Sequence, residues 1–323
     1  MSITPEQASM FQDAFGRLVA NVENVLVGKT FVIRLGFVAL LSEGHLLLED
    51  YPGTGKTSFA RAIAQSVQGS VSRIQFTPDL LPGDITGVSV FDQSRGEFSF
   101  HGGPVFSNIV LADEINRASP KTQAALLEVM EEHRVTVDGV PHPVPSPFMV
   151  VATQNPIESQ GVYPLPEAQL DRFLFKLIAA YPSEKEEAGI VARFGIEQGP
   201  ARPENFGIEA VTDRDALQAS IAAVKAVTLA PENVDYVVRL VRATRSHSDL
   251  AIGASPRAAV LLGNASRVHA ALDGRDYVVP DDVKALATAV LRHRLILSAA
   301  AEIEGREVEA IVSELIESTE APR

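Results

Sequence analysis

A glycine-rich stretch followed by Lys-Thr is the first group of residues that could carry out chemistry. Residues 50–57 read Asp-Tyr-Pro-Gly-Thr-Gly-Lys-Thr, between an apolar segment, His45–Glu49, and a helical pattern, Thr57–Val67. Backbone N–H groups in such a turn surround an anion, and the helix dipole favours negative charge at the N-terminus. The stretch predicts a phosphate-binding loop, in which Lys56 reaches the β- and γ-phosphates and the Thr57 hydroxyl binds Mg²⁺.

One position departs from the common pattern of a phosphate loop, because this chain has Asp50 where the pattern begins with glycine. Aspartate tolerates left-handed backbone better than most residues, so we expect the turn to form. The alternative is a glycine-rich turn that only caps a helix, and the coincidence of strand, turn, Lys-Thr and helix disfavours it. The predicted nucleotide-binding residues are Asp50, Tyr51, Pro52, Gly53, Thr54, Gly55, Lys56, Thr57 and Ser58.

An acidic pair, Asp113 and Glu114, follows the apolar run Ile109–Ala112. Acidic residues at the carboxyl end of a buried strand lie where an open α/β sheet places its ligand site. We expect Asp113 to hold Mg²⁺ and Glu114 to orient and polarise an attacking water molecule. The alternative is a pair that caps a helix ahead of Ser119-Pro120, which would be favoured if the phosphate loop were absent.

Asn155 follows a third apolar strand, Phe148–Ala152. If this strand lies beside the acidic strand, the Asn155 amide can hydrogen-bond the γ-phosphate or the attacking water. An asparagine before Pro156 is also a common turn former. The residue pattern alone leaves both interpretations open.

Two arginines have positions that suggest contact with an anion. Arg257 follows the helix-starting pair Ser255-Pro256, so its cation lies at the positive end of a helix, at a cost of ~0.3–1 kcal/mol unless an anion is near. A nucleotide phosphate or a surface ion pair would compensate that cost. Arg172 precedes the last predicted strand and can project at a domain edge, or it can simply pair with Asp171 or face solvent.

Hydrophobic patterning predicts the elements that position these residues. A capping box at Thr4, Pro5 and Gln7 begins a helix. Five apolar runs of strand length then alternate with helical stretches, which favours a parallel sheet with right-handed crossovers. These runs are His45–Glu49, Val71–Phe76, Asn108–Asp113, Phe148–Thr153 and Phe173–Ile178.

Two insertions interrupt the alternation, and a helical region follows it. Residues 77–106 and 134–144 each contain two short strand-like pieces, the second pair joined by the turn former Asp138-Gly139. The sequence therefore predicts an α/β domain over 1–180 and a smaller all-helical domain over 181–323. The expected helices of that second domain are Glu184–Phe194, Asp213–Lys225, Pro231–Arg245, Pro256–Leu272, Asp281–Leu295 and Ala301–Ile316.

Composition excludes several classes of function. The 323 residues include 28 Lys+Arg and 41 Asp+Glu, so the formal net charge is −13, which disfavours broad nucleic-acid binding. With no cysteine, thiolate nucleophiles, disulfides and cysteine-based metal sites are excluded. We find no histidine-based metal motif, no apolar run long enough to span a bilayer and no signal peptide, so a cytoplasmic protein is expected.

Taken together, these motifs resemble those of the MoxR family of AAA+ ATPases. Their order and spacing cover the chain from about Asn21 to Arg294. The matching stretches are Gly44–Glu49 leading into Pro52–Thr57, Leu111–Ala118, Ala152–Pro156, Leu165–Phe173 and Gly253–Arg257.

The resemblance implies a role for each candidate residue. It implies that Lys56 and Thr57 belong to a Walker A loop and that Asp113 and Glu114 form a Walker B pair. It further implies that Asn155 is sensor 1 and that Arg257 is sensor 2. Arg172 is then the arginine finger, which acts on a neighbouring subunit. Arg117 is a competing candidate for that arginine finger.

The resemblance also implies an assembly and a biological role. It implies a ring, usually hexameric, that binds ATP and Mg²⁺ between subunits, with the helical domain as a lid. The insertions resemble the helix-2 and pre-sensor-1 insertions of this clade. Family members act as chaperone-like motors that help other protein complexes to mature or insert metals into them. They often act with a partner that bears a von Willebrand factor A-type domain. The alternatives are a nucleotide-gated scaffold with little turnover and a nucleic-acid motor.

Overall fold

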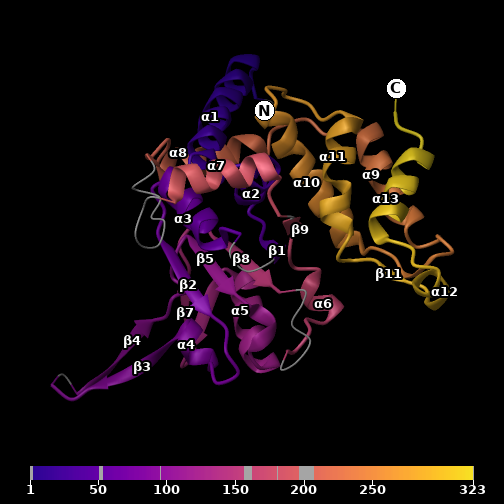
Figure 1. Ribbon diagram of the computed structural model, residues 1–323. Helices are drawn as coiled ribbons and strands as arrows, with labels where there is room; N and C mark the ends of the chain where they lie inside the picture. The colour runs from indigo at the N-terminus through magenta and orange to yellow at the C-terminus, as the bar shows by residue number, and fades with distance from the viewer. Residues whose placement is uncertain are drawn as a thin grey trace. The chain divides into compact units, whose positions relative to one another are not determined.

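The computed structural model describes residues 3–50, 54–94, 96–155, 162–179, 181–195 and 207–322 (Figure 1). The chain divides into two compact units that interleave along the sequence. The predicted domains, 1–180 and 181–323, follow chain order and remain a prediction, whereas the units follow packing. Unit 1 comprises Met1–Gly16, Pro166–Lys176 and Ala219–Arg323, and unit 2 comprises Arg17–Leu165 and Leu177–Gln218.

A five-stranded sheet is the centre of unit 2, with the strand order β2-β5-β8-β1-β9. The pairs β2–β5, β5–β8 and β1–β8 are parallel, which confirms the predicted parallel sheet. Every residue of β8 except the last is buried, as expected of a strand covered on both faces. The strands are β1 (Leu46–Asp50), β2 (Val71–Gln75), β5 (Ile109–Asp113), β8 (Met149–Gln154) and β9 (Phe175–Ala179).

Helices begin where the sequence supplies caps and apolar faces. The first helix begins with the predicted capping box, in which the Thr4 N–H donates to Gln7 Oε1 at 2.9 Å and the Gln7 N–H donates to Thr4 Oγ1 at 3.3 Å. Helix α3 packs against β2 and β5. The helices up to residue 224 are α1 (Pro5–Glu23), α2 (Thr30–Leu41), α3 (Lys56–Ser66), α4 (Pro82–Thr86), the short 3-10 helix η1 (Ile115–Arg117), α5 (Pro120–Glu132), α6 (Glu167–Leu170), α7 (Glu184–Phe194) and α8 (Arg214–Val224).

Both predicted hairpins are present in unit 2. In the first, β3 (Gly87–Asp92) pairs antiparallel with β4 (Glu97–Gly102). In the second, β6 (Arg134–Val137) pairs with β7 (Val140–Pro143) through the predicted Asp138-Gly139 turn. Both turn residues have positive φ, 51° and 79°, as a two-residue type I′ hairpin requires.

Unit 1 is mainly helical, and α10 packs against both α9 and α11. Among the described residues of the chain, no helix is both long and apolar enough to cross a bilayer. A short antiparallel pair, β10 (Leu250–Ile252) and β11 (Ile296–Leu297), lies between the helices in sequence. The helices after residue 224 are α9 (Pro231–Ala243), α10 (Pro256–Leu272), α11 (Pro280–Leu291), α12 (Ala299–Ile303) and α13 (Val308–Ser318).

One predicted helix is wrong, because the expected single helix Ala301–Ile316 is two helices. Gly305 has φ +69° and ends α12 in a Schellman motif. The Arg306 N–H donates to the Ala301 carbonyl at 3.0 Å, and the Gly305 N–H donates to the Glu302 carbonyl at 3.1 Å. The apolar spacing continues across this glycine, so periodicity alone did not reveal the break.

Candidate active site

Three adjacent parallel strands bring the predicted chemical groups to one edge of the sheet. Strand β8 lies between β1 and β5, so the carboxyl ends of all three strands meet there. Glu49 pairs with Gln154, and Gln75 pairs with Asp113. The strand that leads into Asn155 therefore lies beside the acidic strand, as the sequence analysis supposed.

The described part of the phosphate loop has the backbone that an anion site needs. Residues 51–53 lie outside the described structure, and α3 begins at Lys56. Gly55, its N-cap, has φ +97°, a conformation that glycine adopts without strain. Because glycine has no side chain to cap the helix, the first N–H groups of α3 are suited to a phosphate.

A cavity of about 390 Å³ adjoins this loop within unit 2. Its wall combines apolar side chains with a few polar groups, a composition typical of small-molecule sites. We call it the loop-side cavity. Sequence analysis did not identify it, because its walls come from segments that only the fold brings together. The lining residues are Val25, Leu26, Val27, Lys29, Thr54, Gly55, Ser58, Tyr181, Pro182, Glu187, Ile190 and Phe194.

The Asp113 carboxylate is held by two neighbours. Its Oδ1 accepts from Thr153 Oγ1 at 2.7 Å, and its Oδ2 accepts from Arg73 Nη2 at 2.6 Å and Nε at 3.2 Å. Thr153 Oγ1 also accepts from the Glu114 N–H at 2.9 Å, so one threonine fixes both members of the acidic pair. A carboxylate here and the Thr57 hydroxyl on the first turn of α3 are hard oxygen donors, which suit Mg²⁺.

The Glu114 carboxylate is engaged by side chains from two different elements. Its Oε2 accepts from Gln75 Nε2 at 2.9 Å and from Arg117 Nη1 at 3.0 Å. Glu114 has φ 57°, an uncommon backbone conformation for a residue with a side chain and one that clusters at functional sites. In this arrangement the carboxylate is directed towards β2 and η1.

The sequence analysis missed the roles of Arg73 and Gln75. Both lie on β2, two residues apart and on either side of the buried Ile74, so they share the face of the strand opposite to that residue. That alternation was the available signal. It did not reveal the partners, because the contact with Asp113 joins residues 40 positions apart.

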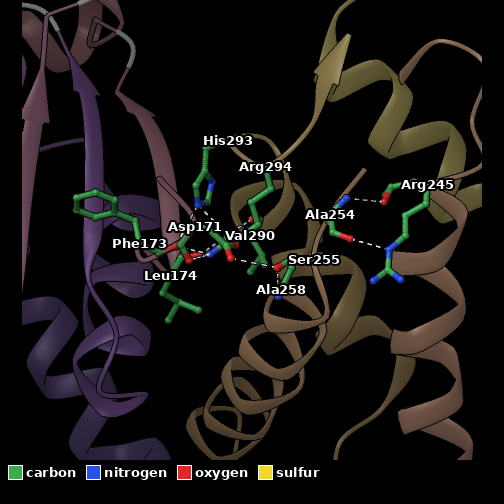
Figure 2. Close-up of polar contacts among 11 residues, drawn as sticks. Asp171, Phe173, Leu174, Arg245, Ala254, Ser255, Ala258, Val290, His293 and Arg294 are labelled. Atoms are coloured by element: carbon green, nitrogen blue, oxygen red, sulfur yellow. Dashed lines mark hydrogen bonds and ion pairs between the residues drawn. The ribbon is translucent and has the colours of Figure 1, made fainter. Parts of the chain in front are cut away.

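The two predicted arginines of unit 1, Arg172 and Arg257, are close in sequence to Asp171 and Ser255. The side chains of Asp171 and Ser255 are hydrogen-bonded to each other. The Asp171 carboxylate binds Arg294 and Ser255, at 2.6 Å and 3.1 Å respectively (Figure 2). Ser255 also caps α10 as predicted, because its Oγ accepts from the Ala258 N–H at 3.4 Å.

A group of acidic and histidine side chains in unit 1 has the spacing of a metal site but the bonding of an ion-pair network. His269 Nδ1 lies 2.7 Å from Asp282 Oδ1. Both oxygens of Asp282 also accept from Arg275, at 2.5 Å and 2.6 Å. The Arg275 guanidinium supplies the positive charge that a metal ion would bring. Asp282 Oδ2 also accepts from the Val279 N–H at 2.8 Å, so this carboxylate caps the start of α11 as well.

Comparisons with known proteins agree with this geometry. The profile of the ATPase family associated with various cellular activities (AAA) matches residues 45–175, and that of the AAA lid domain matches residues 242–315. The chain is 47% identical to Bacillus subtilis YeaC over 95% of this chain and 94% of that protein. It is 46% identical to Chaperone MoxR1 of Mycobacterium tuberculosis, over 95% of this chain and 82% of that protein. A crystal structure from Cytophaga hutchinsonii, described provisionally as an ATPase, superposes with a TM-score of 0.90 at 34% identity over 98% of both chains.

Proposed function

Because the chain belongs to the MoxR family of AAA+ ATPases, we propose that it hydrolyses ATP with Mg²⁺ and uses the cycle to remodel a partner protein complex. One observation carries the proposal: the loop ahead of α3 and the acidic pair at the carboxyl end of β5 lie at the same edge of the sheet. That combination supplies both an anion cradle and a carboxylate for water activation.

The residues of unit 2 support a nucleotide-binding role. The loop-side cavity would accept the flat, partly apolar base, since Gly55 forms part of its wall and is also the N-cap of α3. Lys56 would neutralise the β- and γ-phosphates. Mg²⁺, held by Thr57 and Asp113, would supply further positive charge against the same oxygens.

Glu114 would orient the attacking water and accept its proton. Its Oε2 now binds Gln75 and Arg117, so those contacts would have to loosen before that oxygen could face the water. Asn155 would hydrogen-bond the γ-phosphate or the water. This bonding makes the hydrolytic step dependent on side chains beyond the acidic pair itself.

Assembly completes the proposed site. Arg172 would act as an arginine finger on the nucleotide of a neighbouring subunit, with Arg117 as the competing candidate, and Arg257 would contact the phosphates as sensor 2. A ring, hexameric as is usual for the family, would then share each site between two chains. We further propose a client complex and a partner with a von Willebrand factor A-type domain.

A second function has one observation in its favour. The hydrogen bonds that engage Glu114 also suit a nucleotide-gated scaffold, which binds ATP but turns it over slowly. In that case binding, not hydrolysis, would switch the assembly between two states.

Steady-state phosphate release over a series of protein concentrations tests the proposal. We expect the activity per chain to rise with concentration, and to collapse in Glu114→Gln and in Arg172→Ala. Arg306→Ala is the matched control, because among the described residues the Arg306 side chain of unit 1 forms its ion pairs with Asp249 and Glu314. Full activity in Arg172→Ala contradicts the arginine-finger assignment, and ATP binding without turnover at any concentration favours the scaffold.

A further inference from the structure

Arg294, just beyond α11, is the most thoroughly bonded buried cation among the described residues. Its side chain is 2% exposed. Nε donates to Asp171 Oδ1 at 2.6 Å, and Nη2 donates to the carbonyls of Asp171 and Phe173 at 2.9 Å and 2.6 Å. Nη1 donates to the carbonyl of Val290 and, at 3.4 Å, to that of Leu174 (Figure 2). One guanidinium thus holds the backbone of residues 171–174.

The second oxygen of the Asp171 carboxylate extends this network to α10. Ser255 Oγ donates to Asp171 Oδ2 at 3.1 Å and accepts from the Ala258 N–H at the start of the helix. The Asp171 carboxylate is therefore bonded through one oxygen to Arg294 and through the other to Ser255, the N-cap of α10.

The loop ahead of Ser255 is also fixed, from the end of α9. The Ala254 N–H donates to Thr244 Oγ1 at 2.9 Å, and Arg245 Nε donates to the Ala254 carbonyl at 2.8 Å (Figure 2). At Gly253 an added Cβ would lie 2.7 Å from backbone atoms of Arg245, so only glycine allows this close approach.

These fixed segments carry the two arginines of the proposed site. Arg172 directly follows Asp171, and Arg257 lies two residues beyond Ser255. Burial lowers the pKa of Arg294, the hydrogen bond that Arg294 donates to Asp171 opposes that lowering, and the positive charge of Arg257 adds to it. Arg257 is therefore close enough to Arg294 to interact with it electrostatically.

We propose that Arg294 and Asp171 are positioning residues whose buried pair holds Arg172 and Arg257 in one fixed relation, so that the two cations move as a single body. The inference rests on the roles assigned to those arginines above. A buried ion pair is seldom the most stabilising choice for a core, because apolar residues of equal volume often do as well or better. What this pair provides is directional bonding to two segments that each precede a functional cation.

Amide hydrogen exchange on the protein without nucleotide tests the physical claim apart from catalysis. In Arg294→Lys, which keeps the charge but loses the planar set of donors, we expect protection to fall by about ten-fold both in residues 171–174 and in residues 255–258. Arg306→Lys, the matched control in the same unit, leaves both segments protected. Loss of protection in residues 171–174 alone overturns the proposed coupling.

Turnover in two backgrounds then tests whether Arg294 acts through the cations. We expect Arg294→Lys to lower kcat by about ten-fold in the wild-type chain and by less than about two-fold in the Arg172→Ala chain. An equal loss in both backgrounds identifies a general structural role and overturns the inference. If Arg172→Ala and Arg257→Ala each keep full activity, the site assignment itself fails, and the inference fails with it.

A gentler variant covers the case in which Arg294→Lys does not fold. Ser255→Ala leaves the Arg294–Asp171 pair in place and removes both the bond from Ser255 to Asp171 and the cap of α10. It should lower kcat in the wild-type chain but not in the Arg257→Ala chain. Ser298→Ala is its control, because Ser298 caps α12 in the same unit and that loss should leave kcat unchanged. A loss of kcat from Ser255→Ala that persists in the Arg257→Ala chain contradicts the proposal.

Discussion

The acidic centre of unit 2 and the arginine network of unit 1 use the same kinds of side chain in opposite ways. At the acidic centre, the side chains of Arg73 and Arg117 are 51% and 41% exposed, and each bonds one carboxylate. In unit 1, the side chain of Arg294 is 2% exposed and bonds a carboxylate and four backbone carbonyls. Exposed pairs contribute about 0–1 kcal/mol, whereas breaking a buried pair costs about 3–5 kcal/mol.

The difference teaches which contacts can be exchanged during a reaction cycle. The weak, solvent-screened bonds from Arg73 and Arg117 to Asp113 and Glu114 can be replaced by water, metal or phosphate at little cost. The bonds of Arg294 cannot, because any break leaves a charge buried without a partner. The ion pairs at the proposed chemical centre can therefore be exchanged during the cycle. The buried Arg294–Asp171 pair, next to the segments that carry Arg172 and Arg257, stays in place.

The largest effect is expected from Glu114, a substitution of which should change the rate of hydrolysis but not the stability of the fold. Glu114→Gln should lower kcat by about 10²–10⁴-fold, because the variant cannot accept a proton from water. Nucleotide affinity and the free energy of unfolding should change little. Phosphate release, nucleotide titration and urea unfolding measure the three quantities, with Glu132→Gln on the exposed end of α5 as the control. A large loss of stability in Glu114→Gln breaks the comparison.

Alanine substitution of one arginine from each region tests the contrast directly. Arg294→Ala should reduce the free energy of unfolding by about 3–5 kcal/mol, since Asp171 and four carbonyls lose their donor. Arg73→Ala should cost no more than about 1 kcal/mol. Urea unfolding of both variants gives the comparison, and equal losses would show that burial does not separate the two regions.

Acidification should weaken the buried network through His293, whose Nε2 lies 3.0 Å from the Phe173 carbonyl oxygen and 2.7 Å from Arg294 Nη1. Burial holds the pKa of this imidazole well below its usual 6.5, and the positive charges of Arg294, Lys176 and Arg292 lower it further. Below pH 6.5 the unfolded chain therefore takes up a proton that the folded chain does not. The free energy of unfolding should fall with decreasing pH, by up to about 1.4 kcal/mol per pH unit.

Urea unfolding between pH 7.5 and about pH 5 measures this slope. His293→Gln should flatten this slope, because a glutamine side chain takes up no proton in this pH range. The lowered pKa values of Asp249 and Glu309 act in the same direction but at lower pH, where those carboxylates take up protons. If the slope persists in His293→Gln, the pH dependence of the free energy of unfolding comes from other groups.

The smallest effect is expected from Gln75, and it tests whether the bonds to the Glu114 carboxylate can be exchanged during the cycle. Gln75→Ala removes one hydrogen bond from the Glu114 carboxylate, a net contribution of ~0.5–1 kcal/mol. If release of that bond limits the hydrolytic step, kcat should rise about two- to five-fold. Single-turnover phosphate release measures it. A fall in kcat would mean that Gln75 holds Glu114 in its working position.

Sequence patterns predicted most elements because their signals are local. Asp138-Gly139 marks a turn and Ser255-Pro256 marks a helix start within a few residues, and continuous apolar runs mark buried strands. The phosphate loop and the acidic pair were also predicted from short motifs. The helix break at Gly305 was not predicted, because the apolar spacing continues on both sides of it.

The networks around these motifs were not predictable in the same way. The Arg73–Asp113 and Arg294–Asp171 pairs join positions 40 and 123 residues apart. No local pattern chooses one arginine over another at such distances, and Asp171 was first considered as a partner for its neighbour Arg172. Only the strand register and the packing of unit 1 select the actual partners.

The interleaving of the two units has a consequence for the order of synthesis. Asp171 leaves the ribosome 123 residues before Arg294, which at ~5–20 residues per second is a delay of about 6–25 s. At the start of that interval the segment Pro166–Lys176 is being completed, but residues 219–323, which make up most of its unit, have not been made. The backbone beside Arg172 is therefore secured only once Arg294 has been made, so a chain released before that residue would carry this segment without its anchor.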